Sequence, residues 1–270
     1  MRVTWDTFTE TLACMSVDVG GLYIPARRAL DYSVRFCSPL LFQNDNVDYP
    51  MSIGGSSFLF RYRKRFFQIA TEHQITNLCR YAGEVCVALS SNAETLLLSP
   101  RKSFARKSLS ITDLETDFRI WEHDISLEPS FSRSFLKVTE DHFTSIPPSN
   151  ARNVIVYYTI AFPSNTQRVD LDEQELRSIR MRTNWAKVQL LPDPEAVKLI
   201  DTREYMRCAD TMPEMGRAAD GFSGAPVFAI YQSPDLQCRL AFCGLITHGS
   251  EDGRLAIYPA TRLFSDIRDV

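Results

Sequence analysis

A short stretch late in the chain, ADGFSGAPVFAI (219–230), holds a serine in a setting suited to chemistry. Gly221 and Gly224 lie on either side of Ser223, Pro226 follows three residues later, and a run of apolar residues comes next. This pattern is typical of a tight turn before a buried strand. The turn could serve conformation alone, or it could hold the Ser223 hydroxyl for nucleophilic attack.

A serine hydroxyl is a weak nucleophile at neutral pH, so it needs a base within hydrogen-bond reach and a group that orients the base. The chain has four histidines: His73, His123, His142 and His248. His73 follows an aromatic, strand-like segment and is the candidate base, because a strand end presents a side chain from a rigid scaffold. His123 precedes Asp124 directly and would face the opposite side of a strand, which argues against it as the base.

The candidate orienting acid is Asp124, which opens the apolar segment DISL. Asp113 and Asp117 lie in the same region, ITDLETDFRIWEHD, and compete with it. In this hypothesis His73 takes the proton of Ser223 and Asp124 fixes the imidazole tautomer. The backbone N–H groups of Gly221 and Ser223 would form an oxyanion hole, since glycine lets the backbone turn toward one point.

The segments that must position these residues have the length of strands. Two aromatic runs around a basic centre predict a hairpin over 56–71 with a solvated tip at Arg61–Arg65. Further strand-length segments lie at 84–90, 95–100, 108–114 and 118–127, and, after a break at 145–150, at 153–162, 186–191, 225–231, 240–247 and 254–259. The two groups predict an all-β fold of two antiparallel β-barrels.

Three domains follow from this division: an N-terminal extension over 1–48, a first barrel over 49–148 with His73 and Asp124, and a second barrel over 149–270 with Ser223 and the substrate pocket. The extension is expected to be partly helical after Pro25 and to have a regulatory role. A short C-terminal helix is expected over 259–267, opened by Pro259. The charged segment 169–181 fits either a helix or a charged loop.

Composition excludes several classes of protein. The 270 residues carry a net charge of −3 with a pI near 5.9, which argues against nucleic acid as a partner. No apolar run reaches the roughly 20 residues that span a bilayer, and acidic residues interrupt the N-terminus where a signal peptide would lie. Seven scattered cysteines without a CxxC motif indicate reduced thiols and a cytoplasmic protein. No metal and no cofactor are expected.

With these residues in view, the chain resembles the chymotrypsin-like (trypsin-like) serine peptidases. ADGFSGAPVF resembles the GxSGxP signature around the nucleophile, ATEH the context of the family's histidine, and HDISL that of its aspartate. FCGLITHGS is similar to the strand that lines the specificity pocket, and PATRLF to the C-terminal helix. The resemblance covers residues 50–267 and implies two six-stranded barrels with the site between them.

The resemblance also implies a substrate-binding set of Arg217, Thr247, His248 and Gly249. Arg217, six residues before Ser223, would favour an acidic substrate side chain at the base of the pocket, while an exposed arginine is the alternative. Phe222 replaces the acidic residue that pairs with a new N-terminus in many secreted members, so activation by that route is not expected. Gln74 stands where secreted members have cysteine, which agrees with an intracellular bacterial or viral-type branch.

Three functions compete. The first is a serine endopeptidase that acts on protein or peptide substrates through an acyl-enzyme. The second is an esterase of the α/β-hydrolase kind, but its elbow requires G-x-S-x-G, and Ala225 occupies the fifth position. The third is a latent or inactive binding module on a peptidase-like fold, controlled by a regulatory protein partner, with residues 1–48 covering the cleft.

Overall fold

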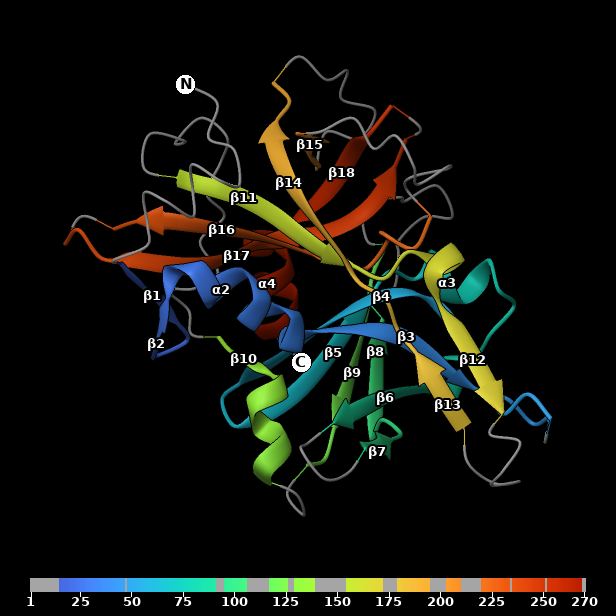
Figure 1. Ribbon diagram of the computed structural model, residues 1–270. Coiled ribbons are helices and arrows are strands. Elements are labelled where there is room, and N and C mark those ends of the chain that lie inside the picture. Colours follow the sequence, from blue (N-terminus) through green and yellow to red (C-terminus); the bar gives the residue numbers. More distant parts are fainter. Residues whose placement is uncertain are drawn as a thin grey trace.

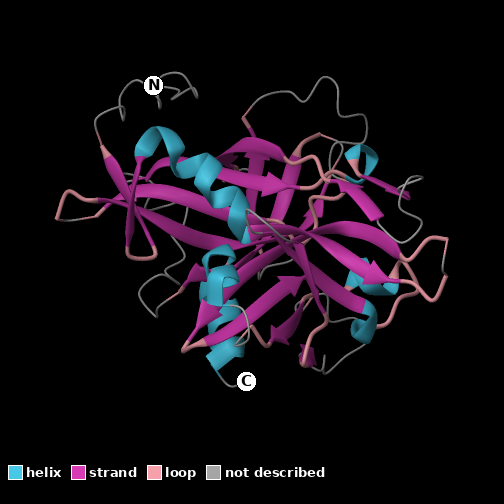
Figure 2. Ribbon diagram, turned by 60° about the horizontal axis from the view of Figure 1, so that its bottom comes forward, coloured by secondary structure: helices cyan, strands magenta, loops and turns pink. Residues whose placement is uncertain are grey.

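The computed structural model describes residues 15–46, 48–90, 95–105, 117–125, 129–138, 154–171, 179–194, 203–209, 220–233, 235–250 and 252–268. Strands make up 55% of the described residues and form a closed six-stranded barrel and a half-barrel, with few helices (Figures 1 and 2). The predicted all-β class is therefore confirmed.

The closed barrel comes from the second half of the chain. Its strand order is β16-β11-β14-β15-β18-β17, and it closes because β16 pairs with both β11 and β17. Figure 1 shows these strands in the upper part of the molecule. The strands are β11 (Val154–Ala161), β14 (Ala186–Pro192), β15 (Glu204–Cys208), β16 (Pro226–Gln232), β17 (Cys238–Gly249) and β18 (Arg254–Pro259).

The half-barrel has the strand order β7-β6-β3-β4-β5-β9-β8, with β10 added beside β4. The predicted hairpin over 56–71 is confirmed as β4 and β5: Arg63 and Lys64 form its tip with φ of 49° and 70°, as a two-residue hairpin turn requires. The strands are β3 (Cys37–Gln43), β4 (Met51–Tyr62), β5 (Arg65–Ala70), β6 (Val85–Ser90), β7 (Thr95–Leu98), β8 (Lys102–Ala105), β9 (Arg119–His123) and β10 (Leu136–Lys137).

Aromatic side chains join the two parts. Phe58 of β4 stacks on Phe242 of β17 with ring centroids 4.4 Å apart, and Phe228 of β16 lies edge-on to Phe58 at 5.8 Å. All three are almost completely buried within one large core cluster. Because burial of apolar area is the main stabilising term, the half-barrel and the closed barrel share one core rather than merely touching.

Residues 16–43 are part of this fold rather than of a separate extension. β1 (Ser16–Val19) pairs in parallel with β17, β2 (Leu22–Pro25) pairs with β1, and α2 (Ala26–Ser33) leads through the 3-10 turn η1 (Val34–Phe36) to β3 in the half-barrel. The helix after Pro25 forms as predicted. A domain boundary at residue 48, however, would separate β3 from β4 and β6, with which it pairs. The sequence pattern of residues 1–48 gave no sign of these pairings.

The remaining elements lie at the ends and edges. The predicted C-terminal helix forms as α4 (Ala260–Arg268). Residues 168–171 and 179–182 form a two-stranded sheet, β12 (Arg168–Leu171) and β13 (Ile179–Arg182), so the expectation of a helix or charged loop over 169–181 is wrong there. Apolar and charged residues alternate in both strands, and this period of two favours extended backbone.

Four short helical turns complete the described elements. The turns α3 (His73–Thr76), η2 (Ala82–Glu84) and η4 (Pro129–Ser134) lie in the half-barrel region, and η7 (Ser164–Thr166) follows β11. Among the described residues, no helix has the length and apolar character needed to cross a membrane. The break expected at 145–150 lies outside the described residues.

Candidate functional site

Ser223 lies in a tight turn at the start of β16, where Gly221 and Gly224 take backbone conformations that suit only glycine. Their φ angles are +89° and +81°. A Cβ on Gly221 would come within 2.5 Å of the Phe162 carbonyl oxygen, and one on Gly224 within 2.1 Å of the Ser56 carbonyl oxygen. Gly221 therefore lets the turn pack against the residues after β11, and Gly224 allows the close approach of the half-barrel at Ser56.

The turn brings the Ser223 hydroxyl to His73. Ser223 Oγ lies 3.0 Å from His73 Nε2. His73 begins α3, three residues after the last residue of β5, so its predicted position at a strand end is confirmed. The two residues are 150 positions apart in sequence and come from opposite barrel parts.

The carboxylate beside His73 is that of Asp117. Asp117 Oδ2 lies 2.5 Å from His73 Nδ1, and Oδ1 accepts the backbone N–H of His73 at 3.0 Å. A carboxylate only accepts hydrogen bonds, so Nδ1 carries the proton and Nε2 presents its lone pair to Ser223. The Asp117 side chain is only 10% exposed, which limits the access of water to this pair.

The structure therefore places Asp117, and not the predicted Asp124, beside His73. Asp117 comes two residues before β9 and Asp124 directly after it, so the whole strand separates them. Seven residues of extended chain span roughly 20 Å, and only one end of β9 reaches His73. The missed signal was the alternation after Asp117, where Phe118 and Ile120 open an apolar strand as well.

An ion pair beside the site helps to fix the position of His73 relative to Asp117. Arg119 Nε and Nη2 donate to the two carboxylate oxygens of Glu72 at 2.7 and 2.8 Å. Glu72 precedes His73 directly, and Arg119 is two residues beyond Asp117. A bidentate pair of this kind has a defined geometry and so helps to hold the base and its acid side by side.

Gln74, the residue after His73, connects the base to the nucleophile turn. Its side-chain amide donates to the carbonyls of Ser223 at 2.9 Å, Gly54 at 3.0 Å and Ser56 at 3.2 Å. Its carbonyl oxygen accepts from both the N–H and the hydroxyl of Thr71 at 2.9 Å. Gln74 is buried, so this amide is a polar junction within the protein interior.

Ser56 makes a second junction across the two parts. Its hydroxyl donates to the Gly221 carbonyl at 2.6 Å and accepts the Phe162 N–H at 2.8 Å, while its backbone N–H donates to the Ser223 carbonyl at 3.2 Å. Sequence reasoning did not single out Gln74 or Ser56 for this role. Their contacts depend on chain segments more than 100 residues apart, which no local pattern reveals.

The peptide groups of the nucleophile turn are fixed in direction. The Asp220 carbonyl accepts from Ser164 N–H at 3.4 Å, and the Phe222 carbonyl accepts from Ala225 N–H at 2.9 Å. In a trans peptide the N–H points opposite to the carbonyl. The N–H groups of Gly221 and Ser223 belong to these two peptides and therefore point away from Ser164 and from Ala225, respectively. Phe222 itself is buried in the barrel core.

The expected substrate-binding residues are only partly described. Arg217 lies outside the described residues. Thr247 is buried, and its hydroxyl accepts from Arg203 Nε and donates to the Ala256 carbonyl, so the side chain is not presented to a substrate. The Thr247 carbonyl accepts from Ser223 Oγ at 3.3 Å. His248 and Gly249 are exposed at the end of β17.

The ring of His248 stacks on that of His73, with centroids 5.2 Å apart and 29° between the planes. The residue as a whole is exposed, but desolvation of the ring lowers its pKa, which the Asp117 carboxylate raises and the nearby His73 and Arg203 lower. The described part of the chain contains one group of three potential metal ligands, His73, Asp117 and His248, whose ligand atoms lie within 4.8 Å of one another.

Arg203 is a buried cation close to the site that sequence reasoning missed. Its guanidinium lies 4.6 Å over the Tyr258 ring, and burial lowers its pKa while the charge of Asp117 raises it. His123, by contrast, is buried away from the site and contacts Gln68 at 3.0 Å. His142 lies outside the described residues.

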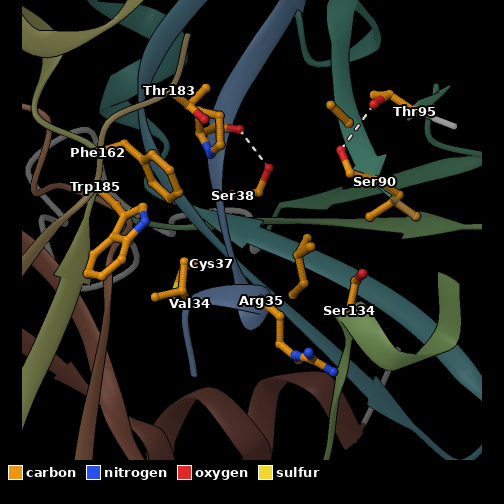
Figure 3. Close-up of a pocket in the computed structure, with 14 residues that line it drawn as sticks. Val34, Arg35, Cys37, Ser38, Ser90, Thr95, Ser134, Phe162, Thr183 and Trp185 are labelled. Carbon is orange, nitrogen blue, oxygen red and sulfur yellow. Dashed lines mark hydrogen bonds between the residues drawn. The ribbon is translucent and has the colours of Figure 1, made fainter. Parts of the chain in front are cut away.

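A separate hollow of about 600 Å³ is lined by residues from both halves of the chain, among them Ser38, Ser90 and Trp185 (Figure 3). None of Ser223, His73 and Asp117 lines it. Phe162 is common to the hollow and to the Ser56 junction beneath the nucleophile turn. The hollow is thus adjacent to the scaffold of the site but does not contain its reactive groups.

The fold and the site together define a β-barrel protein with a hydrogen-bonded serine, histidine and aspartate at the contact of its two parts. Compared with known proteins, the chain matches no family model and no curated protein.

Proposed function

We propose that this protein is a serine endopeptidase of the chymotrypsin-like kind, with Ser223 as nucleophile, His73 as general base and Asp117 as the orienting acid. The observation that carries the proposal is the continuous chain of contacts from Ser223 Oγ to His73 Nε2 and from His73 Nδ1 to Asp117 Oδ2. A closed barrel beside a half-barrel, with the serine in one and the base in the other, supports the same family.

In the proposed mechanism His73 takes the proton of Ser223 as the hydroxyl attacks the substrate carbonyl. Asp117 holds the tautomer and stabilises the imidazolium that forms. The directed N–H groups of Gly221 and Ser223 would then bind the oxyanion, and each such donor is worth roughly 100- to 1,000-fold in rate. His73 next protonates the leaving amine, and water hydrolyses the acyl-enzyme.

Substrate binding is proposed at the end of β17. His248 and Gly249 are exposed beside Ser223 and could contact the substrate near the scissile bond. Substrate binding by Arg217, a cytoplasmic location and control by a protein partner stay predictions from the sequence. A lid formed by residues 1–48 is not favoured, because residues 16–43 belong to the sheets and the shared core.

The test is labelling of the intact protein with a fluorophosphonate probe, together with hydrolysis of a peptide library. We expect Ser223→Ala to abolish labelling and to lower kcat on the order of a million-fold. Ser265→Ala, which removes an exposed serine of α4, is the matched control and should label like wild type. Equal behaviour of wild type and Ser223→Ala toward probe and peptides would overturn the proposal.

A further inference from the structure

The two stacked histidines at the site could coordinate a metal ion, which the proposed peptide hydrolysis does not require. His248 lies with its ring 5.2 Å from that of His73, at the exposed end of β17. The described ligand atoms of His73, Asp117 and His248 lie within 4.8 Å of one another. Imidazole is the commonest nitrogen ligand for transition metals in proteins.

The contact between His73 and Asp117 has the form that metal sites use. A metal-binding histidine usually donates its other ring N–H to a carboxylate, which fixes the tautomer and makes the free nitrogen more basic. Asp117 accepts from His73 Nδ1 at 2.5 Å, which leaves the lone pair of Nε2 directed at Ser223 Oγ, 3.0 Å away. The same arrangement that would activate a base therefore also prepares a metal ligand.

The second ligand must be able to move. In the present orientation the two rings are nearly parallel, at 29°, so their lone pairs do not converge on one point. His248 is exposed, and β17 pairs only with β18 at this position, His248 with Ala256. Metal binding therefore requires the exposed His248 side chain to rotate about its own bonds until one of its nitrogens faces Nε2 of His73.

We propose that a zinc ion, or another borderline transition-metal ion, binds between His73 Nε2 and His248, with Asp117 in the outer shell and water or Ser223 Oγ completing the coordination. Two imidazoles select such ions over Mg²⁺ and Ca²⁺, which prefer oxygen ligands. The ion forms a coordinate bond with the lone pair that Ser223 would otherwise use, so it blocks proton transfer. This inhibitory role rests on the proposed function, whereas binding itself does not.

The first experiment measures binding alone, by titrating Zn²⁺ into the full chain in a calorimeter and Co²⁺ in a visible spectrometer. We expect one ion per chain. His248→Gln and His73→Gln should each weaken binding about 10-fold or more, and Asp117→Asn roughly 10- to 100-fold through the outer shell. Asp124→Asn, at the other end of β9, and Cys79→Ser, at an exposed thiol, are the controls and should bind like wild type.

The second experiment measures inhibition of peptide hydrolysis by Zn²⁺, with each variant compared with its own uninhibited rate. We expect His248→Gln to need about 10-fold or more Zn²⁺ for half inhibition. Equal Zn²⁺ affinity in wild type and His248→Gln, or a Co²⁺ spectrum unchanged by His73→Gln, would overturn the metal site. Specific binding without any peptidase activity would instead uphold the site and overturn the proposed function.

Discussion

At the scale of single residues, the choice of acid decides the chemistry. Asp117 and Asp124 are chemically identical carboxylates at the two ends of one strand, yet only Asp117 contacts both the backbone and the ring of His73. A serine peptidase that lacks this contact holds the wrong imidazole tautomer for part of the time. The two positions therefore form a natural pair for comparison.

Asp117→Asn is expected to lower kcat roughly 10,000-fold, because an amide can donate to Nδ1 and so favours the tautomer that cannot accept from Ser223. Asp124→Asn, at an exposed position, is expected to leave kcat close to wild type. Steady-state hydrolysis of one peptide by both variants measures the difference. A large loss in Asp124→Asn with little effect of Asp117→Asn would refute the assignment.

Sequence reasoning reached Ser223 and His73 because each lies in a recognisable local context: a glycine-bounded turn before an apolar run, and the end of an aromatic strand. It selected Asp124 rather than Asp117 as the partner of His73, because one aspartate precedes and the other follows the same apolar segment. Only the pairing of β9 with β5, Ala70 opposite Arg119, shows which end of β9 faces His73. Strand pairing is a long-range property and leaves no local trace.

At the scale of elements, one amide ties α3, β4 and the nucleophile turn together. Gln74 stands where the secreted chymotrypsin-like peptidases, which this sequence resembles, have a cysteine. The Gln74 amide donates hydrogen bonds to the carbonyls of Gly54, Ser56 and Ser223. A polar junction of this kind holds only when all its partners are satisfied. Its loss would leave the Ser223 carbonyl with only the Ser56 N–H as a donor and would deprive the buried Thr71 of its acceptor.

Gln74→Ala is expected to cost about 1–3 kcal/mol in the free energy of unfolding, as buried polar groups lose their partner. Displacement of Ser223 should also slow labelling by about 100-fold per folded molecule, the typical effect of a 1 Å misplacement. Gln68→Ala is the matched control: it removes another buried amide, bonded to Ser57 and His123, and should lower stability but not the labelling rate. Equal labelling rates in the two variants would contradict the role of Gln74.

At the scale of the whole molecule, the N-terminal segment behaves as part of the core. Val17 of β1 and Leu30 of α2 lie in the same buried cluster as Phe58 and Phe242, which join the two barrel parts. The Ser33 hydroxyl bonds that of Tyr158 in β11 at 2.8 Å. Short strands and one short helix with few apolar residues gave no sequence signal for this packing, so a separate extension was the wrong expectation.

Leu30→Ala is expected to lower the free energy of unfolding by about 2–5 kcal/mol, the usual effect of a cavity in a core. The labelling rate per folded molecule should stay unchanged. Leu22→Ala, at a position 53% exposed on β2, is the control and should change stability by about 0.5 kcal/mol or less. Urea unfolding and probe labelling measure the two quantities. A rise in labelling without a loss of stability would restore the idea of a lid.

The junction at Ser56 has a consequence for the order of events during synthesis. Ser56 and Gly221 are 165 residues apart, and contacts of such separation close long loops and form slowly. The half-barrel and His73 emerge from the ribosome well before Ser223, and the turn around Ser223 is supported by β17 as well, since Gly224 N–H donates to the Ile246 carbonyl. The proposed peptidase is therefore expected to stay inert as a nascent chain until the residues through β17 have been made.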